Sequence, residues 1–520
     1  MNDLRNGNNE KKRYDVIVVG AGNGGLAAAA ALAKGGKRVV LFEKNRTPGG
    51  VATSFRRGRF DFEVSLHELC SFGRDERRSG SVRQLFDFLG ISDRIEWVNV
   101  PEAYRLITYD SPDPIDVTMP FGIDAYIDAM DRYIPGSRAD IQAVFDLAAK
   151  YLNATGSMGQ AKSPADAIRR LLRHKDFLHT CTMSMNDGVA AAGLKGRAAD
   201  VFKGYWAYLC ADGNDLTFMH YLSMVNSYIE LGSVIPKARS LEMTLTLAEC
   251  IEENGGTIYL NSEVGQILVR NGSVYGIVTA DGREYFSDEV ICDISPNTVY
   301  GTLIDPRHIS ERDVRKTNAR ELGGRGFCVF LGLDRSAEEL GLRDYSYFIY
   351  PDMDITKQIG NMAAPETNGV QNTVCLNAAD PDASPAGTCI LTMTTLFTSD
   401  WWEDVSEEDY HRYKDEFAAK MVAVFEKATG VEIADYIEEM EIATPVTFAR
   451  YMNSPQGSIY GYKESNWDSI FSHKLMDKKY SDTAGLEFVG GYGMNLNGYS
   501  SAFGTGFSKA KYILTRDGLL

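Results

Sequence analysis

Residues 14–43 read YDVIVVGAGNGGLAAAAALAKGGKRVVLFE, and this stretch decides the fold. Its first segment, Tyr14–Val19, is short and apolar, as expected of a buried parallel strand. An alanine-rich segment, Gly25–Gly35, has the composition of a helix, and Arg38–Glu43 is a second short strand. Strand, helix and strand in this order form one βαβ unit. The stretch therefore predicts an α/β fold built around a parallel sheet.

The turn between the first strand and the helix carries a GxGxxG motif that comprises Gly20, Ala21, Gly22, Asn23, Gly24 and Gly25. Its glycines permit a tight turn, a close backbone approach to a pyrophosphate, and close packing of helix on strand. The helix N-terminus stabilises the phosphate charge. Glu43, 23 residues after Gly20, can accept hydrogen bonds from ribose hydroxyls. The motif predicts a dinucleotide site; the alternative is a glycine-rich turn without a ligand.

Length and charge limit the other possibilities. A chain of 520 residues exceeds one ordinary core, so two or more domains are expected. The formal net charge of −17 argues against binding to nucleic acid and mildly against anionic lipid. Eight scattered cysteines without a CxxC pair favour free thiols in a reducing cytoplasm over disulfides or a metal site. No apolar run is long enough for a transmembrane helix.

The rest of the chain is first helical in its apolar pattern and then rich in short strands. Residues 82–231 show helical periodicity with many large apolar side chains, whereas the stretch after them is rich in short strands and turns. The predicted elements are a helix at Leu241–Glu253, strands at Thr257–Leu260, Val264–Arg270, Val274–Ala280, Glu289–Cys292, 326–332 and 388–396, a helix at Asp409–Thr429, a strand at Leu486–Val489 and a helix at Thr505–Leu514. The Asn271-Gly272 and Asp281-Gly282 pairs predict hairpin turns.

A second glycine pair follows Glu43. Residues 48–54, Pro-Gly-Gly-Val-Ala-Thr-Ser, resemble the segment that runs along the flavin diphosphate in glutathione-reductase-like, amine-oxidase and phytoene-desaturase enzymes. That resemblance favours FAD over NAD. It adds Lys44, Gly49, Gly50, Ala52 and Thr53 to the expected cofactor-binding residues.

Further segments resemble the phytoene desaturase family, and in particular its branch of carotenoid cis–trans isomerases and all-trans-retinol 13,14-reductases. They are Phe62–His67, Tyr228–Lys237, Phe330–Asp334, Thr444–Thr447 and Gly457–Gly461. The chain departs from the branch at Val51 (usually Arg), Glu63 (Asp), Ser65 (Gly) and Ala238-Arg239 (a glycine pair). These departures leave open whether the reaction is that of the named members or a different one.

The resemblance implies a glutathione-reductase-like Rossmann FAD-binding domain with an interleaved α+β substrate domain. The expected FAD-binding domain comprises residues 14–81, 233–300 and 484–520. The expected substrate-binding domain comprises 82–232 and 301–483, after a disordered tail at 1–13. The resemblance also places Val264 near the adenine, and Gly491, Gly498 and Tyr499 near the flavin ring and ribityl chain.

His67 is expected beside the flavin, where it either moves a proton or only shapes the pocket. Glu68 could raise the basicity of His67 or act as the acid itself, but a carboxylate at the start of a helix is the favoured interpretation. Tyr205, Tyr460 and Tyr499 are weaker candidates for polar contacts near the flavin. The aromatic and methionine-rich stretch 202–228 either lines a tunnel or, for most of its residues, forms ordinary core, and His220 is expected in the core.

The predicted function is FAD-dependent chemistry on carbon–carbon double bonds of an apolar, lipid-like or isoprenoid-like substrate, with hydride transfer at flavin N5. Reduction, desaturation and cis–trans isomerisation remain open. The electron donor or acceptor also remains open, and NAD(P)H is one possible transient reductant. A peripheral contact with a membrane remains open as well. The alternatives are an amine or amino-acid oxidase on the same scaffold and a non-catalytic FAD-containing binding protein.

Overall fold

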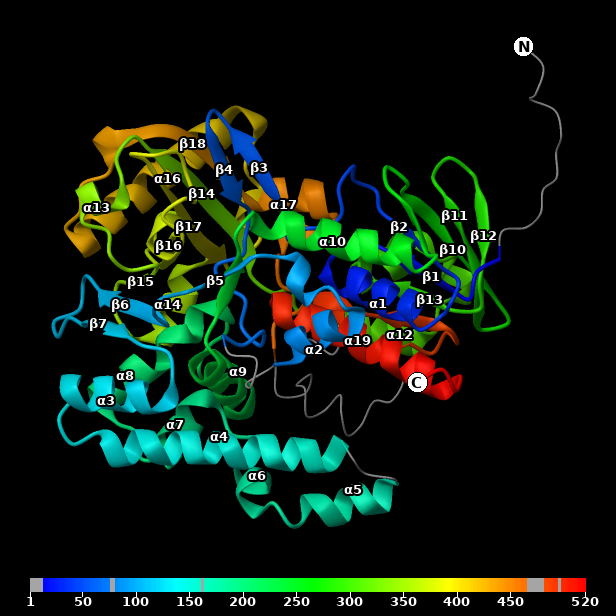
Figure 1. The fold of residues 1–520 in the computed structure, drawn as a ribbon, viewed down its shortest axis with the longest axis horizontal. Helices are drawn as coiled ribbons and strands as arrows, with labels where there is room; N and C mark the ends of the chain where they lie inside the picture. The colour runs from blue at the N-terminus through cyan, green and yellow to red at the C-terminus, as the bar shows by residue number, and fades with distance from the viewer. Residues whose placement is uncertain (1–12, 75–79, 160–162, 465–480, 494–496) are drawn as a thin grey trace.

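The structure, a computed structural model, describes residues 13–74, 80–159, 163–464, 481–493 and 497–520 (Figure 1). Most of the predicted tail lies outside these residues. Arg13, its last residue, pairs with Phe286 in an isolated β-bridge. Within the described residues no helix is long and apolar enough to cross a bilayer.

A five-stranded parallel sheet forms the right half of the molecule in Figure 1. Its order is β19-β13-β1-β2-β9, with strands at Val16–Val19 (β1), Val39–Phe42 (β2), Thr257–Tyr259 (β9), Val290–Cys292 (β13) and Leu486–Phe488 (β19). The predicted α/β fold class is confirmed. The strands come from three distant parts of the chain, so the sheet forms only when these parts meet.

Alternation along β1 divides the core into two layers. Val16 and Val18 pack into the apolar cluster beneath the helices, whereas Ile17 and Val19 pack into the cluster on the opposite face. Both faces of the sheet are therefore covered, which explains why the strand sequences are continuously apolar.

Four helices cover one face: α1 (Asn23–Lys34), α2 (Ser81–Leu89), α10 (Arg239–Glu253) and α19 (Tyr499–Arg516). Figure 1 shows α1 between α10 and α19. The α1 and α19 backbones approach closely, because a Cβ built on Gly506 would lie 2.1 Å from the Gly24 carbonyl oxygen. Small residues on both helices make this contact possible.

A three-stranded antiparallel sheet covers the other face and consists of β10 (Val264–Arg270), β11 (Ser273–Thr279) and β12 (Glu284–Phe286). Both predicted hairpins are confirmed. Asn271 and Gly272, between β10 and β11, both have positive φ (52° and 75°), as a tight two-residue turn requires.

A seven-stranded mixed sheet forms the second half of the molecule. Its order is β18-β14-β17-β16-β15-β6-β7, with strands at Tyr104–Thr108 (β6), Asp116–Met119 (β7), Arg325–Leu333 (β14), Ser346–Tyr350 (β15), Gln371–Cys375 (β16), Cys389–Phe397 (β17) and Ile437–Ala443 (β18). Helix α16 (Glu407–Thr429) packs into the apolar cluster on one face. Two small two-stranded sheets pair β3 (Ser54–Arg57) with β4 (Phe60–Glu63) and β5 (Trp97–Asn99) with β8 (Val234–Pro236).

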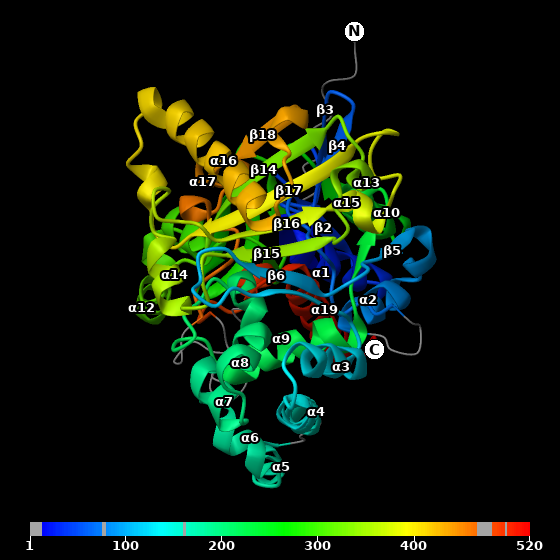
Figure 2. The same cartoon turned by 90° about the vertical axis from the view of Figure 1, so that its left-hand side faces the viewer.

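The other face of this sheet meets a helical lobe, at the bottom of Figures 1 and 2. The lobe contains α3 (Ile123–Tyr133), α4 (Arg138–Gly159), α5 (Pro164–Leu171), α6 (Lys175–Thr180), α7 (Met185–Ala191), α8 (Gly196–Phe202) and α9 (Phe218–Leu231). Shorter helices elsewhere are α11 (Pro296–Thr298), α12 (Glu311–Asn318), α13 (Ala337–Leu340), α14 (Ile355–Asn361), α15 (Leu376–Ala379) and α17 (Pro445–Met452).

The close contact of α19 with α1 predicts that Gly506→Ala destabilises the protein. The added methyl group would meet the Gly24 carbonyl, and overpacking of this kind costs about 1–3 kcal/mol. Thermal unfolding followed by circular dichroism should give a lower midpoint than wild type. Gly360→Ala is the control, because its Cβ has open space on α14. Equal midpoints for the two variants would contradict the proposed packing.

Candidate functional site

A cavity of about 710 Å³ runs from the carboxyl edge of the parallel sheet, past the start of α19, to the space between α9 and the seven-stranded sheet. One end is lined by the glycine turn after β1 and by the end of β2. The other end is lined by α9 together with side chains of β16 and β17. The cavity therefore connects the predicted dinucleotide site with the predicted substrate site.

The glycine turn is built as the motif predicts. Gly20 has φ of +96°, a conformation that residues with a Cβ rarely adopt. A Cβ on Gly22 would lie 2.5 Å from an Asp293 carboxylate oxygen, so that position also requires glycine. The backbones of Gly22 and Gly49 pair in a parallel bridge, which brings the two glycine turns together. Gly20, Gly22, Asn23, Gly49 and Gly50 line the cavity.

Four other predicted cofactor residues do not line the cavity. Gly24 and Gly25 face Gly490 and Asp293 instead, and their role is close packing. Ala52 is fully buried, and Thr53 supports the turn through its backbone, since its carbonyl accepts from Val64 N. These four residues therefore lie behind the residues that line the cavity, and their contact with a cofactor stays a prediction.

Glu43 is buried at the end of β2 and lines the cavity together with Lys44 and Val264. One carboxylate oxygen accepts from Ala21 N at 2.9 Å and the other from Asn45 N at 2.8 Å. A carboxylate has about four acceptor positions, so two backbone donors leave room for hydroxyl donors from a ligand. Glu43 thus fixes the glycine turn and can still accept hydrogen bonds from a ribose.

Asp293 is a site residue that the sequence analysis missed. It follows β13, and its carboxylate accepts from Gly25 N at 2.8 Å at the start of α1. Burial, reinforced by the nearby charge of Glu43, raises the pKa of Asp293 to about 7. The sequence analysis did not predict that β13 pairs with β1. Because the two strands are parallel neighbours, the residue after β13 lies at the same edge of the sheet as Gly20.

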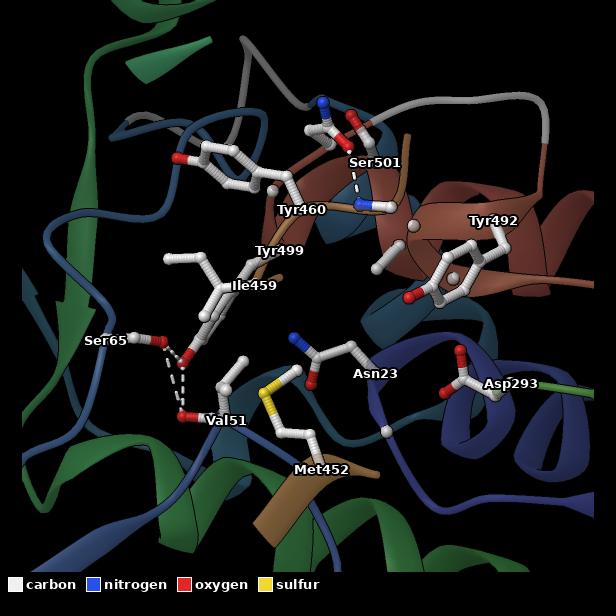
Figure 3. A pocket seen from close by; sticks show the side chains of 18 of the residues that line it. Asn23, Val51, Ser65, Asp293, Met452, Ile459, Tyr460, Tyr492, Tyr499 and Ser501 are labelled. Carbon is white, nitrogen blue, oxygen red and sulfur yellow. Dashed lines mark hydrogen bonds between the residues drawn. The ribbon is translucent and has the colours of Figure 1, made fainter. Parts of the chain in front are cut away.

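The first turn of α1 suits a phosphate group. It contains no acidic residue, so its backbone N–H groups face no competing side-chain charge of their own helix. The Asn23 side chain points into the cavity (Figure 3), and its buried Oδ1 has no hydrogen-bond partner among the described residues. Buried polar atoms normally have a hydrogen-bond partner, and a polar ligand at this helix N-terminus would supply one for Asn23 Oδ1.

Residues before and at the start of α19 close the cavity on the side opposite these two glycine turns. Gly491, Gly498 and Tyr499 all line it, and Gly498 has φ of +87° at the N-cap of α19. The Tyr499 hydroxyl donates to Val51 O at 2.9 Å and lies 3.0 Å from Ser65 Oγ (Figure 3). Two positions that depart from the family pattern, Val51 and Ser65, therefore meet at one tyrosine.

The other two departures also meet. Arg239 has φ of +72°, the conformation that the usual glycine would take, and its guanidinium donates to the carbonyls of Asp61, Lys237 and Ala383. The next residue, Ser240, donates its N–H at 2.8 Å to the buried Glu63 carboxylate. Burial raises the pKa of Glu63 to about 7.

His67 lines the cavity from the loop after β4. Its Nδ1 lies 3.3 Å from the Tyr208 hydroxyl, and its Nε2 lies 3.0 Å from Thr394 Oγ1 on β17. Burial lowers the pKa of His67 to about 4, so the imidazole is neutral near pH 7. A neutral ring with two hydroxyl partners can pass a proton from one side to the other but holds no permanent charge.

Glu68 lies in the same loop and not at a helix start, so the favoured interpretation of this carboxylate was wrong. Its two oxygens accept from the Tyr208 hydroxyl at 3.4 Å and from Ser346 Oγ at 3.1 Å. Burial raises the pKa of Glu68 to about 8. Tyr208 therefore connects a carboxyl group that is largely protonated at neutral pH with the imidazole that lines the cavity.

Among the aromatic candidates, Tyr205 does not line the cavity: its hydroxyl donates to Ala103 O, and its ring packs in the core. Tyr460 lines the cavity (Figure 3). Of stretch 202–228, α9 presents His220, Ser223, Met224, Ser227 and Tyr228 to the cavity, while most of the other large side chains pack in the core as expected. His220 is buried and paired as predicted, yet it also lines the cavity.

No group of three or more His, Cys, Asp or Glu side chains that could hold a metal ion occurs among the residues that the structure covers. All eight cysteines are free thiols.

The chain is similar to known proteins in both sequence and fold. Residues 18–89 match the family model of the NAD(P)-binding Rossmann-like domain. All-trans-retinol 13,14-reductase of Danio rerio is 24% identical over 86% of this chain and 77% of its own length. Prolycopene isomerase 2 of an Oncidium hybrid cultivar, a chloroplastic protein, is 24% identical over 87% of this chain and 76% of its own. Putrescine oxidase superimposes with a TM-score of 0.62 over 97% of this chain and 99% of its own, at 15% identity.

The fold, the paired glycine turns and these relatives define the class of the protein, an oxidoreductase built on the fold of flavin-dependent enzymes. Within that class the chain is a homologue of the all-trans-retinol 13,14-reductases and the prolycopene isomerases. The resemblance predicted from the motifs is thereby confirmed.

The burial of Glu68 predicts an effect of Glu68→Gln on stability that depends on pH. Because the folded pKa is raised to about 8, the folded state holds the proton more tightly than the unfolded state does. The stability that this gives is fully present below the ordinary pKa of glutamate and is lost as pH rises through about 8. Glutamine, neutral throughout, should come nearest to wild type below the ordinary pKa of glutamate and gain relative stability as pH rises through about 8.

Urea unfolding at several pH values measures this difference. Glu252→Gln on the exposed surface of α10 is the control and should show no such trend. A Glu68→Gln difference that is constant with pH would contradict the raised pKa.

Proposed function

We propose that the protein is an FAD-dependent enzyme that acts on carbon–carbon double bonds of an extended, mostly apolar substrate. The observation that carries the proposal is the continuous cavity, which joins a glycine-turn dinucleotide site to a chamber where Glu68, Tyr208 and His67 form one hydrogen-bonded chain. The relatives named as a retinol reductase and a prolycopene isomerase support this substrate class.

The residues present fit FAD. The N-terminus of α1 and the two glycine turns would hold the diphosphate, Glu43 the ribose, and the wall beside Val264 the adenine. Gly491, Gly498 and Tyr499, at the start of α19, would border the flavin ring. When bound, FAD supplies hydride transfer to or from an alkene carbon at its N5.

The chain's own part in the chemistry is to move one proton. We call the chain of Glu68, Tyr208 and His67 the proton relay. For the transfer the Tyr208 hydroxyl, which donates to Glu68 in the structure, would turn to donate to His67 Nδ1 and accept the proton of the Glu68 carboxyl, while the opposite ring nitrogen gives a proton to the cavity. In the structure His67 Nε2 lies beside Thr394 Oγ1, which also lines the cavity. The Thr394 hydroxyl would either pass the proton on to the substrate or be displaced from Nε2 by the substrate.

The substrate chamber suits a mostly apolar molecule. Its wall includes Leu209, Met224, Met362, Val370, Leu396 and Ile459. Burial in such a chamber strengthens the hydrogen bonds of the relay and positions an alkene that offers few polar handles.

The deciding experiment is anaerobic spectroscopy of the purified holoprotein. Flavin that is bleached by dithionite or NAD(P)H and regains its absorbance when a polyene is added would support reduction of a double bond. A product of unchanged mass and altered geometry, formed while the flavin stays reduced, would mean isomerisation. A preparation that neither contains nor takes up FAD would remove the basis of the proposal.

The same experiment tests the amine oxidase alternative. Bleaching of the oxidised flavin by an amine, with release of peroxide in air, would favour that activity over the one proposed. The likeness to putrescine oxidase concerns the fold alone.

The relay predicts that Tyr208→Phe slows the chemical step. Loss of the hydroxyl breaks the connection between Glu68 and His67, and positioned proton transfer contributes about 10²–10⁴-fold to a rate. Stopped-flow reoxidation of the reduced flavin by a polyene should slow by about that factor, with an unchanged flavin spectrum. Tyr410→Phe, distant on α16, is the control. Reoxidation at the wild-type rate would exclude Tyr208 from the proton path.

We also propose contact with an anionic membrane surface through α5. On and just after this helix Ile168 and Leu172 are exposed (59% and 63%), with the basic side chains of Arg169 and Arg173 beside them. Apolar and basic side chains together favour an interfacial helix even on an acidic protein.

The wild-type protein should sediment with phosphatidylglycerol vesicles but not with phosphatidylcholine vesicles. The double variant Ile168→Asp/Leu172→Asp should lose this sedimentation. Leu245→Asp, at an exposed position on α10, should keep it. Equal binding by both variants would exclude α5.

A further inference from the structure

The dinucleotide end of the cavity contains a carboxylate that the proposed function does not use. Asp293 follows β13, is partly buried and lines the cavity. Its carboxylate lies against the glycine turn, because a Cβ built on Gly22 would lie 2.5 Å from Oδ2 and one built on Gly24 would lie 2.9 Å from Oδ1. Figure 3 shows this side chain on the same side of the cavity as Asn23. An acidic group therefore lies at the helix end that would bind the cofactor.

Asp293 takes the place of an N-cap side chain on α1. The N-cap residue itself is Gly22, which has no side chain to accept from the first amides of the helix. The Asp293 carboxylate accepts instead from the N–H of Gly25, the third residue of the helix, at 2.8 Å. An N-cap oxygen normally accepts from the second or third residue. One of the amides that attract an anion is thus already bonded to a carboxylate of the chain.

Two anionic groups would meet at this helix end once FAD is bound. The diphosphate would lie at the N-terminus of α1, where Gly22 and Asn23 line the cavity together with Asp293. A helix N-terminus carries about half an elementary positive charge, less than one carboxylate can neutralise. No Lys or Arg side chain within the described part of the chain shifts the pKa of Asp293. An ionised Asp293 therefore opposes the diphosphate, whereas a protonated Asp293 does not.

The neighbours of Asp293 let it change charge near neutral pH. The titratable groups that face it are Glu43 at the end of β2, Cys292 on β13 and Tyr492 after β19. Burial, reinforced by the charge of Glu43, raises the pKa of Asp293 to about 7. Burial also raises the pKa of Tyr492 to about 12 and raises that of Cys292, so both stay uncharged in this range. A diphosphate nearby would raise the pKa of Asp293 further.

We infer that the Asp293 carboxylate and the diphosphate of the cofactor compete for the N-terminus of α1, so that FAD binds together with a proton on Asp293. The inference rests on the proposed function, because it needs FAD at this site. It makes Asp293 a residue that sets the affinity for the cofactor and links that affinity to pH.

The release of FAD from the full-length holoprotein measures this link. Holoprotein is diluted into buffers between about pH 6 and about pH 9, and the free flavin is determined from its fluorescence. The dissociation constant of wild type should be nearly constant below about pH 7. Above that value it should rise by up to about tenfold for each pH unit, because the uptake of one proton gives this slope.

Two neutral variants assign the dependence to Asp293. Asp293→Asn keeps an oxygen that can accept from Gly25 N but cannot ionise, so it should bind FAD with little dependence on pH. At about pH 9 it should bind FAD about tenfold or more tightly than wild type. Asp293→Ser, a second neutral residue that suits an N-cap, should behave in the same way. Asp288→Asn, a change of a 73% exposed side chain before the same strand, is the control and should keep the wild-type profile.

Two competitors assign the effect to the diphosphate. ADP-ribose contains the adenosine and diphosphate of FAD without the flavin, and riboflavin contains the flavin without phosphate. The competition constant of ADP-ribose against FAD should rise with pH as the dissociation constant of FAD does. Riboflavin should show no such dependence. The diphosphates of FAD and ADP-ribose stay fully ionised throughout this range, so the dependence belongs to the protein.

The outcomes separate this inference from the proposed function. A wild-type dissociation constant that does not change with pH would overturn the inference and leave the function intact. So would neutral variants that keep the wild-type slope or bind FAD more weakly at every pH, because Asp293 would then support the cofactor or only cap the helix. An equal slope for riboflavin would also overturn it. If the wild-type protein neither contains nor takes up FAD, the proposed function fails and this inference fails with it.

Discussion

The structure depends on the close approach of three backbone segments at the carboxyl edge of the parallel sheet. The turn after β1, the residue after β13 and the turn after β19 meet around the Asp293 carboxylate. A Cβ on Gly22, Gly24 or Gly490 would fall within 3.0 Å of an atom of one of the other segments. Because nothing larger than hydrogen fits, the three segments lie in backbone contact, and Gly22 and Asn23 at the start of α1 line the cavity. The shape of the dinucleotide end follows from this constraint.

The two ends of the cavity differ in the hydrogen-bond partners of their polar groups. At the glycine turns, carboxylates accept from backbone amides, and the buried Asn23 Oδ1 has no partner among the described residues. In the substrate chamber the polar groups are paired with one another, as in the relay from Glu68 to His67 and in the pair of His220 with Glu464. The first arrangement suits a ligand with many polar atoms, and the second suits one with few. The division agrees with a cofactor at one end and an apolar substrate at the other.

Local patterns in the sequence predicted the βαβ unit, both hairpins and the strands of the parallel sheet. They failed where tertiary contacts decide. Helix α19 begins at Tyr499, six residues before its predicted start, because its serine- and glycine-containing first turns have weak helix propensity but pack against α1. Asp293, Tyr208 and Thr394 belong to the site through pairing of segments far apart in the chain, which no local periodicity records. Glu68 was assigned to a helix from composition, although its loop is held by the distant Ser346 and Tyr345.

The placement of α19 has a consequence for biosynthesis. This helix and β19 complete the same sheet and cavity that β1 and α1 begin, although almost the whole described chain lies between them. On the ribosome, α1 must therefore wait with one side uncovered until the last described segment emerges. A dinucleotide bound at this edge would contact both segments, so its complete binding site exists only after the last described segment has been synthesised.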